Sequence, residues 1–295
     1  MTSTPANAAV TSTVEVIGAA GETDLLDELE TADSGLERLI ARISYTRTFA
    51  IQGDTQLRRG TLFYEREAPA VGPGAAEKGD AGANKPVPTR RFAIRFDELV
   101  VGGRSEQLEQ MYVFDGEWVV EKVPADRQFT KRQVVPPGET FDPLRIGEGP
   151  FPVPLGQRKA DILSRFIASE PDSADGIPPA FEGFAIDKKL RQLRLVPRQG
   201  SAESASFDEI RVWYREIELP SGGTTLLPQI ARTIEPTGDE SLVILLDLDP
   251  NGAPLGDVFD TTTPPRDEAW NVHIQPWRGS ADDAEAGSDA SMAPG

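Results

Sequence analysis

The segment YVFDGEWVVEKVPADRQFTKRQVVPPGETFDPLRIGEGPFPVPLG, residues 112–156, decides the fold of this chain. Asp115-Gly116 supplies the positive φ angles that a two-residue type I′ turn needs, so residues 111–114 and 118–123 are predicted to form a tight hairpin. Residues 127–132 are expected to pair next to it. The prolines that follow withdraw backbone donors and fix φ, which excludes an interior strand or helix. The segment therefore predicts three antiparallel strands that run into a semi-rigid crossing loop.

Apolar residues alternate with polar ones in several other segments, as in a strand with one buried face. The alternation begins at Ile43 and continues through Tyr45, Phe49 and Ile51, and residues 57–66 are expected to return antiparallel to it. Further strands are predicted at residues 92–96, 193–196, 210–217, 228–234, 242–248 and 272–274, with turns at Gly222-Gly223 and Asn251-Gly252.

Two segments have helical spacing instead. Thr23 is a candidate N-cap for a short helix that ends near Ala32, with its three leucines on one face. Residues 157–168 place Ile162, Leu163, Phe166 and Ile167 on one stripe. The predicted fold class is therefore α+β: one strongly curved antiparallel sheet, an incomplete barrel, with helices covering its concave face.

The charge of the chain is unevenly distributed. The formal net charge is −18, yet residues 1–37 hold eight acidic residues and residues 279–295 hold four, with no lysine or arginine in either segment. Both ends are therefore expected to be disordered acidic tails, residues 1–23 and 278–295, around one domain at residues 24–277. Residues 68–88 contain no aromatic residue and are expected to form a flexible insertion. Adjacent basic residues form only short pairs, such as Arg58-Arg59 and Lys188-Lys189, within a negative chain, so nucleic acid is not an expected partner.

The sequence offers little for catalysis. There are no cysteines and one histidine, His273, which alternates with apolar residues and is expected to be an ordinary strand residue. We expect no enzymatic activity, no cofactor and no metal. Paired carboxylates suited to glycoside hydrolysis remain open, because their separation cannot be read from a sequence.

One motif resembles half of a calcium loop. Asp247, Asp249, Asn251 and Gly252 match the first part of an EF-hand, but the twelfth position is Val258 instead of a chelating glutamate, and the flanks are predicted strands. An Asn-Gly turn is the preferred interpretation. No run of about eighteen apolar residues is present, and the first residues lack the basic and apolar regions of a signal peptide.

Taken together, five motifs occur in an order that resembles the LolA-like family of periplasmic lipoprotein carriers. They are residues 36–49, residues 60–64, residues 91–96, the DGEW turn, and the closing pair of Asn251-Gly252 with residues 271–274. They extend over about four fifths of the chain. The resemblance implies an incomplete barrel, lidded by helices, that holds the acyl chains of lipoproteins.

The resemblance also implies site residues. The expected acyl cavity comprises Tyr45, Phe49, Leu62, Tyr64, Phe92, Ile94, Phe96, Met111, Val113, Trp118, Val120, Phe129, Leu163, Phe166 and Ile167. The same residues would also suit an ordinary core, and the sequence does not separate the two roles. Residues 157–168 are expected to be a movable lid, and Arg66 corresponds to the basic latch residue of the family, although Glu67 and Ala68 separate it from Pro69.

By this resemblance the chain is a monomeric, non-enzymatic carrier in the periplasm. It would take lipoproteins from a lipoprotein-releasing transporter of the inner membrane to an acceptor at the outer membrane. The alternative is a periplasmic module that senses lipids or lipoproteins and acts on an envelope-stress partner.

Overall fold

The computed structural model describes residues 24–32, 34–67, 89–135, 146, 154–155, 157–253, 255–265 and 268–277. The predicted tails, the insertion at 68–88, the Thr23 cap and most of the proline-rich loop lie outside these residues. The helices are α1 (Asp24–Thr31), α2 (Lys159–Arg165) and α3 (Glu182–Asp187), with short 3-10 turns η1 (Pro179–Phe181), η2 (Ala202–Ala205) and η3 (Gly256–Phe259). The strands are β1 (Arg38–Phe49), β2 (Asp54–Glu67), β3 (Thr89–Val101), β4 (Arg104–Phe114), β5 (Trp118–Val123), β6 (Gln128–Gln133), β7 (Phe166–Ser169), β8 (Arg191–Pro197), β9 (Glu209–Glu218), β10 (Thr224–Ile234), β11 (Glu240–Pro250) and β12 (Asn271–Gln275).

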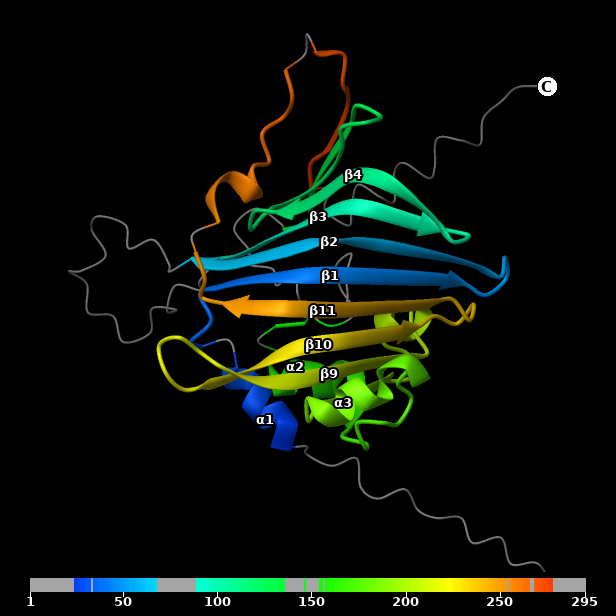
Figure 1. Ribbon diagram of the computed structural model, residues 1–295, viewed down its shortest axis with the longest axis vertical. Helices are drawn as coiled ribbons and strands as arrows, with labels where there is room; N and C mark the ends of the chain where they lie inside the picture. Colours follow the sequence, from blue (N-terminus) through cyan, green and yellow to red (C-terminus); the bar gives the residue numbers. More distant parts are fainter. Residues whose placement is uncertain are drawn as a thin grey trace, which may run out of the picture.

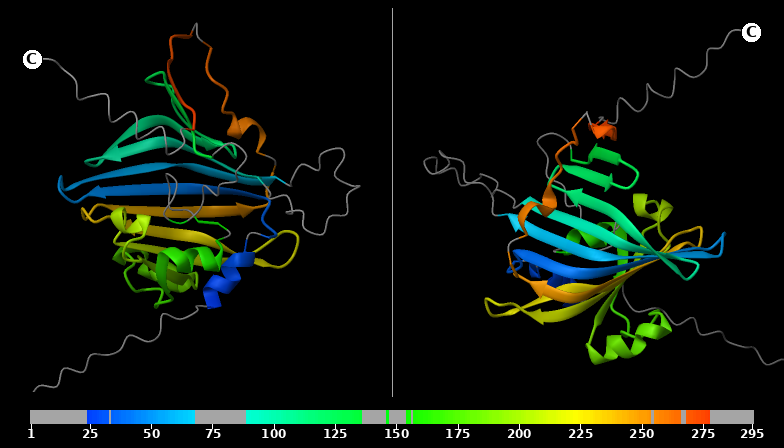
Figure 2. Two further views of the ribbon diagram at one scale, coloured as in Figure 1. Left: turned by 180° about the vertical axis from the view of Figure 1, so that it is seen from behind. Right: turned by 45° about the horizontal axis from the view of Figure 1, so that its top comes forward.

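All twelve strands form one sheet in the order β12-β6-β5-β4-β3-β2-β1-β11-β10-β9-β8-β7. Figure 1 shows the central strands from β4 to β9 side by side in this order. Neighbouring strands are antiparallel except for β12, which pairs parallel to β6. The sheet is twisted and curved, and its edge strands β7 and β12 do not pair, so it is not closed into a barrel (Figure 2). The predicted class, a curved antiparallel sheet with few helices, is confirmed.

The predicted central hairpin is present. Met111 pairs with Lys122 and Phe114 with Val119, while Gly116 has a positive φ of 112°. The carboxylate of Asp115 accepts hydrogen bonds from the backbone N–H groups of Glu117 and Trp118, which fixes the turn. β6 follows β5 as expected.

One face of the sheet, here called the inner face, carries the larger apolar cluster. The leucines of α1 and Ile162 of α2 pack on it, and α1 contacts α2. Strand register explains which residues share this face, because side chains directly opposite one another point the same way. Leu39 lies opposite Tyr64, which in turn lies opposite Phe92.

The other face, here called the outer face, carries two smaller clusters. One cluster lies on β9, β10 and β11 around Trp213, and Ala185 of α3 packs against it. The second lies on β3 to β6 and is covered by Leu255 and Phe259. Neither α3 nor this outer layer was predicted from the sequence.

The helix predicted at residues 157–168 is shorter than expected. α2 ends at Arg165, and Phe166 has extended φ and ψ angles of −128° and 157°. Residues 166–169 form the edge strand β7 against β8. The guanidinium of Arg165 donates to the carbonyl of Ile146 and pairs with Glu203, so contacts with distant segments fix the helix end. The prediction of a helix through Ala168 was wrong because strand pairing outweighed the helical spacing.

Ile51 was also expected on a buried strand face. β1 ends at Phe49, and Ile51 lies in the turn that follows, with 81% of its surface exposed. The alternation of β1 therefore ends one apolar residue earlier than the sequence suggested.

Candidate functional site: an aromatic pocket on the inner face

Seven of the expected cavity residues face the inner side of the sheet. These are Tyr45, Phe49, Leu62, Tyr64, Phe92, Ile94 and Phe96. Most of them are packed as ordinary core. Tyr64 is fully buried, and the rings of Phe92 and Phe114 stack with 5.8 Å between their centroids. α1 and α2 cover this packed part of the face.

The inner face is hollowed at the end of β1 near Phe49. A pocket of about 270 Å³ lies there, and its described lining comes from four adjacent strands: Tyr45, Arg47 and Phe49 of β1, Gln56 and Arg58 of β2, Phe96 of β3 and Tyr112 of β4. Three of these residues were expected in the cavity. No residue of α1 or α2 is among the described lining residues.

Four aromatic rings give the pocket its walls. Tyr45 and Phe96 are 6.4 Å apart between ring centroids, and Phe96 meets Tyr112 edge-on at 6.4 Å. The guanidinium of Arg47 lies 5.2 Å from the centroid of the Phe49 ring. These rings offer apolar surface beside the polar groups of Arg47, Gln56 and Arg58, so the described lining is mixed in character.

The hydroxyl of Tyr112 is held in place by hydrogen bonds with Glu121 and Gln110. It donates to Glu121 at 2.9 Å, and Gln110 donates to both Tyr112 and Glu121 at 2.7 Å. Burial, together with the hydrogen bond to the Glu121 carboxylate, raises the pKa of Tyr112 well above its ordinary value. Tyr112 is therefore a neutral phenol throughout the physiological pH range.

Tyr45 is tied to β11. Its hydroxyl lies 3.3 Å from the hydroxyl of Ser241. The rings at both sides of Phe96 are therefore held by hydrogen bonds, so the pocket walls are fixed before a ligand arrives.

Gly60 sets the spacing of the strands beside the pocket. It lies opposite Phe96 at an irregularity in the β2–β3 register, and a Cβ atom built on it would lie 1.9 Å from the carbonyl oxygen of Arg95. Only glycine permits this approach, which brings β3 close to β2 where Phe96 forms the pocket wall.

Five expected cavity residues lie on the outer face instead. They are Met111, Val113, Trp118, Val120 and Phe129. Val113 pairs with Val120, and Lys122 lies opposite Phe129. Leu255 and Phe259 pack on this face. The structure does not bring these five residues to the pocket, because each lies one position out of phase with inner-face neighbours such as Tyr112 and Phe114.

The expected lid residues separate in the same way. Phe166 is fully buried in the inner-face cluster and Leu163 packs against that cluster. Ile167 points to the opposite side and is 44% exposed. None of the three is among the described lining residues of the pocket.

Arg66, the expected latch, contacts the segment between α1 and β1. Its guanidinium donates to the carbonyl of Ser34 at 2.6 Å. α2 is tied to other segments by Arg165 and by Lys159, which pairs with Asp27 of α1 at 2.8 Å, and neither contact was predicted.

The residues of the partial calcium motif have other partners. The side-chain oxygen of Asn251 accepts from the backbone N–H groups of Glu37 and Arg38, and its amide donates to the carbonyl of Gly35. Asp247 pairs with Arg42 at 2.5 Å. Asn251 has a positive φ of 55°, as an Asn-Gly turn requires. A search of the described residues finds no group of three or more histidine, cysteine or acidic residues that would hold a metal.

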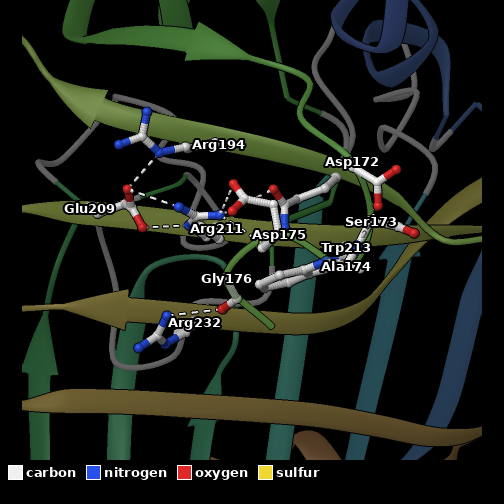
Figure 3. A network of polar contacts seen from close by, with 11 residues as sticks. Asp172, Ser173, Ala174, Asp175, Gly176, Arg194, Glu209, Arg211, Trp213 and Arg232 are labelled. Carbon is white, nitrogen blue, oxygen red and sulfur yellow. Dashed lines mark hydrogen bonds and ion pairs between the residues drawn. The ribbon is translucent and has the colours of Figure 1, made fainter. Parts of the chain in front are cut away.

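Figure 3 shows a polar network on the outer face, over β8, β9 and β10. Glu209 accepts hydrogen bonds from Arg194 and Arg211, and Arg211 also reaches Asp175 at 2.8 Å. Arg232 donates to the carbonyl of Gly176, and the Trp213 indole donates to that of Ser173. These bonds anchor residues 172–176 on the sheet, and we assign the network a structural role.

Four lining residues of the pocket were missed by the sequence analysis: Arg47, Gln56, Arg58 and Tyr112. Arg47 carries a usable signal, because it lies between Tyr45 and Phe49 on the same strand face. Gln56 and Arg58 are polar at positions where a core strand would be apolar, and only the strand register shows that they face the pocket.

Comparisons with known proteins give a distant likeness of fold. No family model matches the chain, and no curated protein matches it. Among solved structures, the chain is similar to a putative outer membrane lipoprotein-sorting protein domain from Vibrio parahaemolyticus, with 13% identity, a TM-score of 0.35, and coverage of 79% of this chain and 93% of that one. It is also similar to a LolA superfamily protein from Nitrosomonas europaea, with 9% identity, a TM-score of 0.32, and coverage of 78% and 93%.

A third similar structure is the complex of MucA and MucB from Pseudomonas aeruginosa, with 16% identity, a TM-score of 0.34, and coverage of 81% of this chain and 60% of that one. Likeness at these values carries no information about what this chain binds. No helix among the described residues is long and apolar enough to cross a membrane. Two of these similar structures carry names of the kind that the resemblance in the sequence predicted, a lipoprotein-sorting domain and a LolA superfamily protein.

Proposed function

We propose that the chain is a non-enzymatic carrier that binds acyl chains of lipoproteins on the inner face of its sheet. In this role it takes them through the periplasm, from a lipoprotein-releasing transporter in the inner membrane toward an acceptor at the outer membrane. The observation that carries the proposal is the aromatic pocket at the end of the inner face.

The size of the pocket limits what it can hold. Its volume of about 270 Å³ is just below the range of roughly 300–1,000 Å³ that is usual for small-molecule sites. It therefore accommodates the end of one acyl chain rather than several whole chains. Each methylene group that leaves water contributes about 0.8 kcal/mol to binding before the costs of association are subtracted.

The rest of a longer chain would need apolar surface that is now packed. This surface adjoins the pocket, because Phe96 lines the pocket and belongs to the same cluster as Phe92 and Tyr64. The helices α1 and α2 cover this surface, and the two helices are in contact with each other. Movement of this cover would extend the pocket along the inner face.

The proposal is tested with a tripalmitoylated lipopeptide and the same peptide without acyl chains, titrated against the full-length protein by fluorescence. We expect saturable binding of the acylated peptide only. Phe49→Glu places a charge in the pocket wall, and this charge would have to leave water when the ligand binds. We expect it to weaken binding about tenfold or more, which corresponds to ~1.4 kcal/mol.

Ile51→Glu is the matched control, since it adds the same charge two residues away at an exposed turn position. It should bind like the wild type. Equal binding of the acylated and unacylated peptides, or equal loss in both variants, would contradict the proposal.

A further inference from the structure

We propose that Arg58 makes the pocket selective for amphiphiles whose head is an anion, a carboxylate or a phosphate monoester. This inference deepens the proposed function and rests on it, because it assumes that the pocket binds an apolar chain. It adds a polar recognition site to the aromatic walls.

Arg58 is the lining cation for which the described residues supply no ion pair. Among the described residues, its guanidinium donates one hydrogen bond, to the side-chain oxygen of Gln56 at 3.3 Å, which is long and involves a neutral acceptor. Its Nε atom is buried and has no hydrogen-bond partner within the part of the chain that the structure describes. A buried donor of this kind is costly unless a ligand satisfies it.

Arg47, the second lining cation, also has a buried Nε without a hydrogen-bond partner among the described residues, but its charge is paired. It pairs with Glu235 at 3.0 Å and with Asp239 at 3.8 Å, on the turn between β10 and β11. Its charge is thus balanced from outside the pocket. The neighbouring Arg59, which points to the outer face, is balanced by Glu98 at 2.8 Å.

The carboxylates around the pocket are already engaged. Glu121 accepts from Tyr112 and Gln110, and Glu235 and Asp239 hold Arg47. None of these three is among the described lining residues. The described lining therefore presents guanidinium groups to a ligand and includes no carboxylate.

Strand register places the polar and apolar groups side by side. Tyr45 lies opposite Arg58 and Arg47 opposite Gln56, so the two strands present a row of donors along one wall. The rings of Tyr45 and Phe96 form the adjoining wall. A ligand with an anionic head and an apolar tail matches both walls, and a guanidinium is suited to bind carboxylate or phosphate through two parallel hydrogen bonds.

The test measures displacement of a neutral fluorescent probe from the full-length protein by four competitors: dodecanoic acid, dodecyl phosphate, 1-dodecanol and inorganic phosphate. We expect the two anionic amphiphiles to bind about tenfold or more tightly than 1-dodecanol. Arg58→Gln should abolish this preference while 1-dodecanol still binds, and Arg58→Lys should keep part of it. Arg59→Gln, the adjacent arginine on the other face, should behave like the wild type.

Each result has one meaning. An equal affinity for dodecanoic acid and 1-dodecanol, or a preference that survives in Arg58→Gln, overturns the anion site but leaves the proposed carrier function standing. Failure of every dodecyl compound to bind overturns both. Displacement by inorganic phosphate at the same concentration as dodecyl phosphate would show a site for a free anion and overturn the assignment to an amphiphile.

Discussion

At the scale of single residues, polar side chains on the two faces of this sheet have different roles. On the outer face, the carboxylate of Glu209 is surrounded by arginines and holds residues 172–176 in place through Arg211 (Figure 3). On the inner face, Arg58 has no such carboxylate partner among the described residues. The outer-face arginines that are paired with a carboxylate thus belong to a structural network, whereas Arg58, unpaired among the described residues, belongs to a candidate binding site.

The Glu209 network predicts a pH-dependent contribution to stability. Partial burial acts to raise the pKa of Glu209, but the hydrogen bonds from Arg211 and Arg194 outweigh it and hold the pKa below its usual value. Because the pKa is lower in the folded than in the unfolded state, the stabilisation is fully present above about pH 4.5 and is lost as the pH falls through the folded-state pKa.

Glu209→Gln should therefore lower the free energy of unfolding at pH 7, and the difference from the wild type should shrink toward pH 3. Urea denaturation across this range measures it. Glu216→Gln, at an exposed position near the end of the same strand, serves as the control and should give a small, pH-independent change. A difference for Glu209→Gln that is constant with pH would contradict the assignment.

At the scale of secondary structure elements, the strands with strict alternation were predictable and the element boundaries set by distant contacts were not. Phe92, Ile94 and Phe96 alternate in the sequence and are buried on one face. Asp115-Gly116 identified the position of the central hairpin, although only Gly116 of the two residues has the positive φ that a type I′ turn requires. These features are local, so a single sequence contains them.

The end of α2 is different, because it depends on groups far away in the sequence. Ile162, Leu163, Phe166 and Ile167 fit a helical stripe, yet pairing with β8 and the buried contacts of Arg165 convert residues 166–169 into a strand. The same limit applies to the pocket. The faces of β4 and β5 depend on the strand register: Phe114 lies opposite Phe92 on the inner face, so Val113 and its partner Val120 lie on the outer face.

Because residues 166–169 form a strand, we expect substitutions at neighbouring positions to change the free energy of unfolding by different amounts. Phe166→Ala removes a fully buried ring and should lower the free energy of unfolding by about 3–5 kcal/mol. Ile167→Ala changes a side chain that is 44% exposed on the other side, and its effect should stay below about 1 kcal/mol. Chemical denaturation measures both values. Losses of similar size would instead support a helix that buries both residues on one stripe.

At the scale of the whole molecule, the sheet has two apolar faces with different covers. The outer face is covered by α3 at one end and by η3 at the other. The inner face is covered by α1 and α2 over its packed part and is hollowed near the end of β1, where strands alone supply the described lining. The central claim is that this hollow end of the inner face is where acyl chains bind.

Photo-crosslinking tests this claim most directly. The probe is a tripalmitoylated lipopeptide with a diazirine at the end of one acyl chain, and mass spectrometry assigns the labelled residues with and without an excess of unmodified lipopeptide. We predict that the competed label falls on pocket residues such as Tyr45, Phe49, Phe96 and Tyr112. Competed label concentrated on outer-face residues such as Val120, Phe129 and Phe259, or no competed label at all, would contradict the account.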